Sequence, residues 1–127
     1  MAKSAHLDTH LVVWLYSGNI SLISTKVMEI LETSDLFYCP IVKLEIQYLK
    51  EIKRITKGPE TIISSLEREI GIKESNNPFT GLTDKSISLG WTRDPFDRLI
   101  VADAIVSKAV LLTKDDTILR NYNKAVW

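Results

Sequence analysis

Apolar residues in this chain occur either as short continuous runs or at helical spacing, and the two patterns alternate. The short runs predict buried strands at 5–8, 36–39 and 109–113, with a last short strand at 125–127. Apolar positions three or four residues apart predict helices over 21–32, 40–55, 60–70 and 95–108, with shorter helical segments at 11–16, 82–89 and 117–121. Short strands alternating with helices are typical of a parallel sheet covered on both faces. We therefore expect an α/β fold, a three-layer α/β/α sandwich with a central parallel β-sheet.

The predicted helix over 40–55 carries a carboxylate on its apolar side. Its apolar stripe consists of Ile41, Val42, Tyr48, Leu49 and Ile52. Glu45 lies in the middle of this stripe, and the opposite side is basic or polar. A carboxylate in such a position is unfavourable unless its surroundings compensate it. Glu45 is therefore a candidate functional residue.

Two more carboxylates mark the start of the predicted helix over 95–108. Asp94 is a good N-cap, Pro95 suits the first helical position, and Asp97 lies in the first turn, where the helix dipole favours negative charge. Capping and the dipole therefore explain this segment without any function. We interpret Asp94 as a cap. Its functional alternatives are orientation of Asp97 or of a metal-bound water, and metal ligation ranks below these.

Acids at other places in the chain favour a functional interpretation of Asp97. Asp8 follows the first strand and Asp115 follows the last buried strand, so both lie at the carboxyl edge of the sheet, where ligands gather. Glu45 and Asp97 come from helices that start at the same edge. Two carboxylates ~4 Å apart repel by about 4 kcal/mol at an effective dielectric of 20, so a proton or a metal must relieve such a cluster. Carboxylate ligands suit Mg²⁺ or Mn²⁺ better than zinc, and the natural reaction is phosphodiester hydrolysis by a metal-activated water.

Composition narrows the class of protein. The 127 residues are most simply a single domain, 1–127, and 16 basic against 16 acidic residues create no global field that attracts nucleic acid. Cys39 is the only cysteine, which excludes an internal disulfide, and its apolar neighbours predict a core position. No apolar run is long enough for a membrane span, so we expect a soluble, cytoplasmic protein without membrane contact.

Other polar and aromatic residues are weaker candidates. His6 and His10 flank Asp8 without a ligand spacing, and Asp103 lies about 240° around its helix from Asp97, which predicts a solvated acid or an ion-pair partner. The tryptophans are most simply core residues, although they could stack on bases: Trp14, Trp91 and Trp127. One local basic surface is expected, mostly as a solvated helix face: Lys43, Lys50, Lys53, Arg54 and Lys57.

Four segments of the chain resemble the PIN domain, specifically the VapC-type toxins of toxin–antitoxin pairs. These segments are 6–10 (HLDTH), Glu45 after a buried strand, 93–100 (RDPFDRLI) and 111–115 (LLTKD). The RDPFDR segment is the most specific of them. The resemblance spans essentially the whole chain in the order and spacing of the family.

The resemblance implies a divalent-metal ribonuclease that acts on RNA and is inhibited by a small antitoxin protein. We also expect a homodimer. The metal-binding acids of this ribonuclease would be Asp8, Glu45, Asp97 and Asp115, and Thr113 would place a hydroxyl near the metal. The neighbouring Asp116 leaves the register of the fourth ligand open by one residue.

Two other functions remain possible from the sequence. A module with this fold and these acids could hold RNA or a protein partner without cleaving it. A phosphoacceptor domain using Asp8 or Asp115 fits less well, because it does not explain Glu45 on an apolar face or the Asp94 and Asp97 pair.

Overall fold

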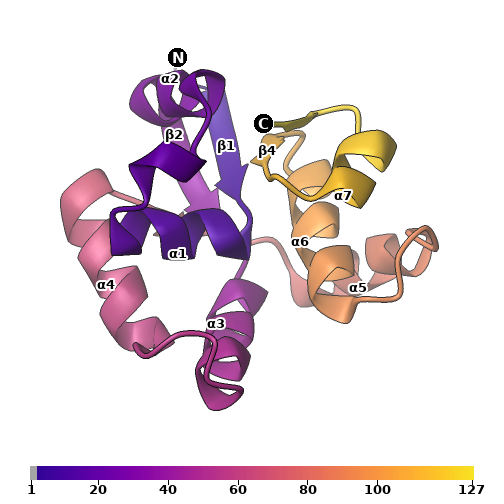
Figure 1. The fold of residues 1–127 in the computed structure, drawn as a ribbon. Coiled ribbons are helices and arrows are strands. Elements are labelled where there is room, and N and C mark those ends of the chain that lie inside the picture. The colour runs from indigo at the N-terminus through magenta and orange to yellow at the C-terminus, as the bar shows by residue number, and fades with distance from the viewer. Residues whose placement is uncertain (1–2) are drawn as a thin grey trace.

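A computed structural model describes residues 3–127, so residues 1–2 of the predicted domain lie outside the described range. Its centre is a five-stranded sheet in the order β3-β2-β1-β4-β5. The strands are β1 (Lys3–Leu7), β2 (Ser34–Tyr38), β3 (Lys73–Glu74), β4 (Val110–Leu112) and β5 (Ala125–Val126). Each neighbouring pair is parallel. The predicted α/β fold with a central parallel sheet is confirmed (Figure 1).

Helices connect the strands and form the outer layers. Within residues 3–127 they are α1 (Thr9–Ser17), α2 (Thr25–Thr33), α3 (Ile41–Glu51), α4 (Pro59–Ile70), α5 (Phe79–Ile87), α6 (Pro95–Val106) and α7 (Asp116–Asn121), with a short 3₁₀ turn, η1 (Ile20–Leu22). Side-chain caps start four of them, because Asp8, Ser24, Asp94 and Asp115 each accept a backbone N–H of the following turn. Local sequence chemistry therefore sets where these helices begin.

The two faces of the sheet are covered by different helices. On one face, Tyr38 of β2 and Ile63 of α4 line a common pocket, and α4 packs against α1. On the other face, His6 of β1 meets Asp103 of α6, and α5 packs along α6. Figure 1 shows α1 and α4 on one side and α5 and α6 on the other. The chain builds the sheet outward from β1 to β3 and then returns to place β4 on the other side of β1.

The apolar stripe predicted for the helix over 40–55 is only partly buried. Val42 and Ile46 are fully buried, whereas Tyr48 is 49% exposed and Ile52, just beyond the end of α3 at Glu51, is 45% exposed. The prediction is wrong for Tyr48 and Ile52, because α3 packs against its neighbours through the Val42 and Ile46 side. Glu45 adjoins Ile46 and is half-buried.

No helix among residues 3–127 is both long and apolar enough to cross a membrane. The core is one cluster of buried apolar side chains from the sheet and its covering helices, and Cys39 belongs to it as predicted.

Candidate functional site

Asp8 lies at the carboxyl end of β1, where the chain turns into α1. Its side chain is 3% exposed, and each oxygen has a partner. Oδ1 accepts the backbone N–H of Thr9 at 2.7 Å, and Oδ2 accepts the hydroxyl of Thr113 at 2.6 Å. The backbone N–H of Asp8 also donates to Leu112 of β4 at 3.1 Å. Asp8 is therefore held in one orientation by two neighbouring strand ends.

Thr113 links Asp8 to Asp115. The threonine is fully buried directly after β4, and its oxygen accepts the backbone N–H of Asp115 at 3.1 Å. Asp115 is half-buried and caps α7, because its Oδ1 accepts the backbone N–H of Ile118 at 2.9 Å. The parallel order of β1 and β4 thus brings the two acids to one edge, although 107 positions separate them in the chain.

Glu45 reaches the same edge from α3. Its Oε1 accepts a 2.5 Å hydrogen bond from the hydroxyl of Thr9, the residue next to Asp8. Burial raises the pKa of the Glu45 carboxyl to about 7. The Thr9 hydrogen bond acts against this shift, and the charges of Asp8 and Asp94 add to it.

Asp97 occupies the first turn of α6 and has the most perturbed carboxyl of this edge. Burial, as the largest cause, and the charges of four other acids together raise its pKa to about 8; these acids are Asp8, Asp94, Asp115 and Glu45. These five acids therefore lie within electrostatic reach of one another. We call Asp8, Glu45, Asp97 and Asp115 the acid cluster.

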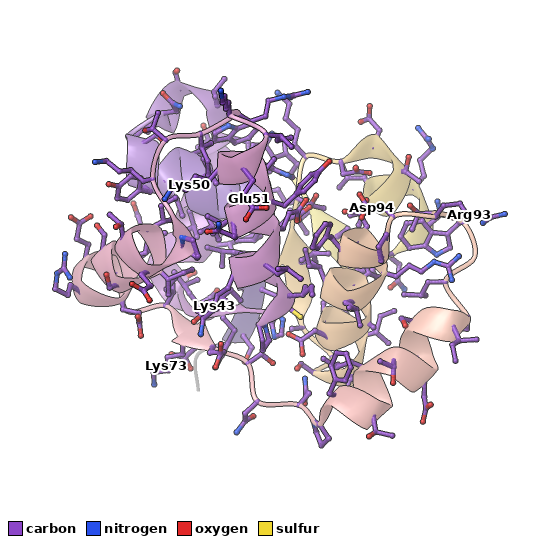
Figure 2. The ribbon with its side chains drawn as sticks, turned by 90° about the horizontal axis from the view of Figure 1, so that it is seen from below. Lys43, Lys50, Glu51, Lys73, Arg93 and Asp94 are labelled. Carbon is purple, nitrogen blue, oxygen red and sulfur yellow. The ribbon has the colours of Figure 1, made fainter. Side chains whose placement is uncertain are left out.

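Asp94 acts as the predicted N-cap. It is exposed, and its Oδ1 accepts the backbone N–H of Phe96 at 2.8 Å and of Asp97 at 3.4 Å. By this contact it also orients the turn that carries Asp97. Figure 2 shows Asp94 next to the exposed Arg93 at the start of α6.

The two neighbouring acids after β4 differ in their surroundings. Asp116 is the exposed first residue of α7, whereas Asp115 is the half-buried cap whose charge contributes to the pKa of Asp97. This difference favours Asp115 over Asp116 as the member of the acid cluster.

The donor atoms of the acid cluster suit a hard divalent cation, because all are carboxylate oxygens and mutual repulsion disfavours the cluster without a counter-charge. As the side chains stand, no group of three or more His, Cys, Asp or Glu residues within 3–127 is arranged to hold a metal ion. The chemistry of the cluster fits Mg²⁺ or Mn²⁺, and binding an ion requires the acids to close around it.

Comparison with known proteins gives a clear answer for the fold. No protein-family model matches the sequence, and no curated protein matches it significantly. Solved structures do match. VapBC2 of Rickettsia felis bound to promoter DNA matches with a TM-score of 0.67 and 15% identity, over 97% of this chain and 96% of that chain. A toxin–antitoxin complex of Klebsiella pneumoniae matches with a TM-score of 0.65 and 16% identity, over 97% of this chain and 96% of that chain. VapBC-1 of nontypeable Haemophilus influenzae matches at TM-score 0.63, with 17% identity over 98% of this chain and 96% of that chain.

This chain has a PIN-like fold. The identities lie below 20%, so the likeness concerns the fold. Within the PIN-like fold, the acid cluster occupies the carboxyl edge of the sheet, where parallel α/β proteins bind ligands.

His10 borders the acid cluster of the PIN-like fold in a way that sequence reasoning missed. Its Nε2 accepts the backbone N–H of Lys114 at 2.9 Å, so the ring proton resides on Nδ1, which lies 3.6 Å from Oδ2 of Asp8. The ring also contacts Trp14 and Trp127, with centroids 5.0 and 6.1 Å away. The prediction that His10 is no metal ligand remains a prediction, but its position two residues after Asp8 was a signal for a positioning role.

Asp103 is a fully buried acid on the face of the sheet covered by α6. Its Oδ2 lies 3.2 Å from Nδ1 of His6, and its Oδ1 accepts the Ser75 hydroxyl at 2.9 Å and the Asn77 amide at 2.8 Å. Burial works to raise the pKa of Asp103, but the contacts with His6, Asn77 and Ser75 outweigh it and lower the pKa. Of the two predictions, the ion-pair partner is confirmed and the solvated acid is wrong.

The remaining aromatic and basic candidates lie outside the acid cluster. Trp91 and Trp127 pack against the core, and Trp14 packs edge-on against Trp127 at 5.7 Å. The predicted basic surface is exposed along α3 and the loop after it, where Figure 2 shows Lys43 and Lys50. Lys43 is neutralised by a 2.7 Å ion pair with Glu74.

Proposed function

We propose that this chain is a metal-dependent endoribonuclease that hydrolyses RNA phosphodiester bonds as the toxin of a toxin–antitoxin pair. The observation that carries the proposal is the meeting of four acids at one edge of the sheet: Thr113 links Asp8 to Asp115, Thr9 links Asp8 to Glu45, and the charges of these three acids help to raise the pKa of Asp97. Carboxylates that disfavour one another's charge in this way are stabilised by a shared cation. The likeness of the fold to toxin–antitoxin components supports the toxin assignment.

Three acids of the cluster are held in place by neighbouring residues. Asp8 uses one lone pair of each oxygen for Thr9 and Thr113, which leaves the second lone pair of each oxygen available. Thr9 fixes Glu45 by its hydroxyl, and Asp94 fixes the turn that carries Asp97. When bound by Asp8, Glu45, Asp97 and Asp115, Mg²⁺ or Mn²⁺ supplies a Lewis acid and a water of low pKa for phosphodiester hydrolysis.

Protons occupy the acid cluster when no cation is bound. The pKa values of Glu45 and Asp97, about 7 and about 8, keep part of both carboxyls protonated at neutral pH. A cation displaces these protons because it binds the carboxylate form. We therefore expect metal binding near pH 7 to release protons, which calorimetry in buffers of different ionisation enthalpy measures.

The proposed antitoxin has a suitable place to bind. An apolar groove of about 300 Å³ lies between α3 and α5 and is lined by Ile41, Leu44, Phe79, Leu82 and Leu99 among others. Phe79 is 66% exposed and Leu44 is 57% exposed, so the groove presents apolar surface to a partner. An antitoxin segment in this groove could direct an arginine at the acid cluster and neutralise it. The predicted homodimer remains a prediction.

A cleavage assay tests the proposal. The purified protein is expected to cut single-stranded RNA with Mg²⁺ or Mn²⁺ and to lose this activity in chelator. Asp97→Asn should be inactive, whereas Asp84→Asn, which changes an exposed acid of α5, should remain active and serves as the matched control. Undiminished cleavage in chelator would refute the metal mechanism.

The alternative is a module that binds RNA or a protein without cleaving it. RNA binding by parent and Asp97→Asn alike, with no cleavage under any metal, would establish that alternative. Co-expression with the product of a neighbouring small gene should abolish cleavage if the toxin assignment holds. A complex that forms and leaves full activity would exclude inhibition by this route.

A further inference from the structure

Three lysines gather at the amino edge of the sheet, opposite the acid cluster. Lys3 begins β1, Lys108 precedes β4, and Lys124 precedes β5, and these strands are neighbours in the sheet. Ala5 pairs with Val110, so the parallel register places Lys3 level with position 108. Lys124 is one residue before the start of β5, and its carbonyl accepts the backbone N–H of Leu111 at 3.0 Å. Topology thus collects residues from three distant parts of the chain.

These lysines line a pocket of about 560 Å³, which we call the lysine pocket. Its other lining residues are neutral, and they include Ser4, Ser107 and Asn123, whose side chains can donate hydrogen bonds. No acidic residue lines it, and none of the three lysines forms an ion pair within residues 3–127. The pocket therefore carries three uncompensated positive charges in a chain whose net charge is zero.

The backbone at Lys108 supports a role for its side chain. Lys108 follows α6 in the left-handed region, with φ of 54°. This conformation disfavours residues with a Cβ by about 1–2 kcal/mol, and glycine is the usual residue at such a position. Part of that cost is offset because a cation near a helix C-terminus interacts favourably with the dipole. Lys53 after α3 shares the conformation, with φ of 64°, but does not line the lysine pocket, so the two positions make a matched pair.

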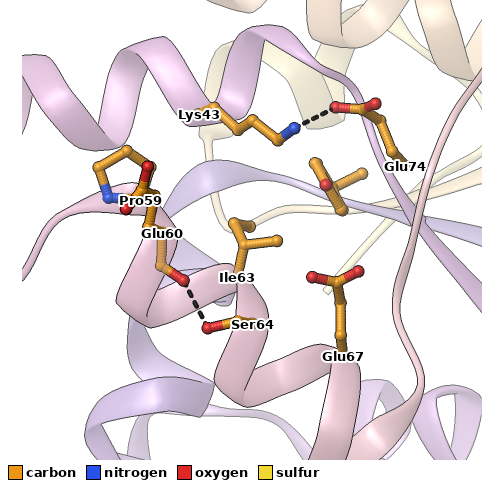
Figure 3. A pocket seen from close by; sticks show the side chains of 8 residues that line it. Lys43, Pro59, Glu60, Ile63, Ser64, Glu67 and Glu74 are labelled. Carbon is orange, nitrogen blue, oxygen red and sulfur yellow. Dashed lines mark hydrogen bonds and ion pairs between the residues drawn. The ribbon is translucent and has the colours of Figure 1, made fainter.

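The pocket beside Lys43, at one end of the basic surface on α3, is less suited to a polyanion. Figure 3 shows Lys43 of α3 paired with Glu74 in a pocket that also presents Glu60 and Glu67. Three glutamates against one lysine make that pocket acidic in sum. The lysine pocket has the opposite balance, because it contains lysines and no acid.

An RNA substrate needs such a positive surface away from the point of cleavage. The acid cluster repels phosphates, so binding energy for the rest of the strand has to come from elsewhere on the protein. The five residues of β1 span roughly 17 Å at about 3.3 Å per residue, which is the separation between the two edges of the sheet. A strand of several nucleotides bridges this separation.

We propose that the lysine pocket binds backbone phosphates of the RNA strand whose scissile phosphate lies at the acid cluster. Lys3, Lys108 and Lys124 contact phosphate oxygens as charged donors, and the nearby hydroxyl and amide groups add neutral hydrogen bonds. This contact does not depend on base sequence, because phosphates carry no sequence information. The inference rests on the proposed ribonuclease function for its choice of RNA.

The salt dependence of RNA binding tests this assignment. Binding of a labelled single-stranded RNA is measured in chelator, where no cleavage occurs, for the parent and for Lys3→Gln/Lys108→Gly/Lys124→Gln. Each lost phosphate contact on a single strand lowers the slope of log K against log salt by about 0.7, so the variant should lose about 2 units of slope. Glycine at position 108 adopts the left-handed conformation without the cost of a Cβ. Melting curves show whether the variant folds.

The control is Lys50→Gln/Lys53→Gly/Lys57→Gln, which removes the same charge and also places a glycine at a positive φ. It should keep the parent slope. An equal loss in both variants, a loss in the control alone, or no loss in either overturns the proposal. Binding of inorganic phosphate to these lysines, with RNA binding unaffected by their loss, would reassign the pocket to free phosphate and overturn it too.

The outcome separates this inference from the proposed function. RNA binding that depends on the lysine pocket, in a protein that never cleaves RNA, would retain the pocket and reject the ribonuclease. If the protein cleaves RNA but its RNA affinity does not change when the three lysines are replaced, the ribonuclease function is retained and the role of the lysine pocket is rejected.

Discussion

Thr113 donates its hydroxyl proton to Oδ2 of Asp8 across a distance of 2.6 Å, and this hydrogen bond joins the ends of β4 and β1. The same threonine oxygen accepts the backbone N–H of Asp115. One buried hydroxyl thus orients one acid of the cluster and positions the turn that carries another. A change at Thr113 should therefore affect both acids together.

The stability of the metal-free protein should depend on pH through Asp97. Its pKa is raised from 3.8 to about 8, so the folded state binds this proton more tightly than the unfolded state. The stabilising contribution is complete below pH 4 and is lost as pH rises through about 8. We expect the melting temperature of the parent in chelator to fall as pH rises through about 8, and that of Asp97→Asn to fall less.

The same variant should respond weakly to metal. An ion at a hundredfold excess over its Kd stabilises the parent by roughly 2.7 kcal/mol, which raises the melting temperature by several degrees. Asp97→Asn should melt at or above the parent temperature in chelator near pH 8 and should barely move with Mn²⁺. A lower melting temperature with an intact metal response would assign Asp97 to the helix end alone.

The register of the fourth acid can be decided by two neighbouring substitutions. Asp115→Asn should lose most of the RNA cleavage, because it removes a charge of the acid cluster but keeps an oxygen that accepts the Ile118 N–H. Asp116→Asn changes an exposed residue and should lose much less. The cleavage rates of the two variants are compared at saturating Mn²⁺. A larger loss in Asp116→Asn than in Asp115→Asn would assign the fourth ligand to Asp116.

His10 should act as a positioning residue for Asp8. His10→Phe keeps the packing against Trp14 and Trp127 but removes the contacts with Asp8 and the Lys114 N–H. We expect a loss of about 10- to 100-fold in kcat with little change in KM, the range observed for residues that orient metal ligands. His10→Gln, which retains an acceptor for Lys114, should recover part of kcat. Equal losses in both variants, or a change confined to KM, would contradict this role.

The buried Asp103 should matter for stability and little for chemistry. Asp103→Ala leaves His6 without its acidic partner and removes the acceptor of the Ser75 hydroxyl, and breaking a buried pair of this kind destabilises by about 3 kcal/mol. Denaturant unfolding measures the loss, and cleavage per folded molecule should remain near the parent value. Because the folded pKa of Asp103 is lowered, its contribution is present above pH 3.8 and lost at more acidic pH. A fully stable but inactive variant would oppose this assignment.

Features that depend on near neighbours in the chain could be predicted from the amino-acid sequence alone. Alternating apolar runs predicted the parallel sheet, and side-chain chemistry located helix starts such as the Asp94 cap before Pro95. The spacing of acids after strands and at helix starts was enough to propose the acid cluster. These inferences work because capping and periodicity act over a few residues.

Which side chains meet across the sheet could not be predicted from the sequence and became known from the folded chain. Four features depend on residues that are far apart in the chain. They are the burial of Asp103 against His6, the exposure of Tyr48, the contact of His10 with the Lys114 turn and the grouping of lysines at the amino edge. A helical period shows that two residues share a face but not which element covers that face. Strand order and register supply that information, and they arise from the packing of the whole chain.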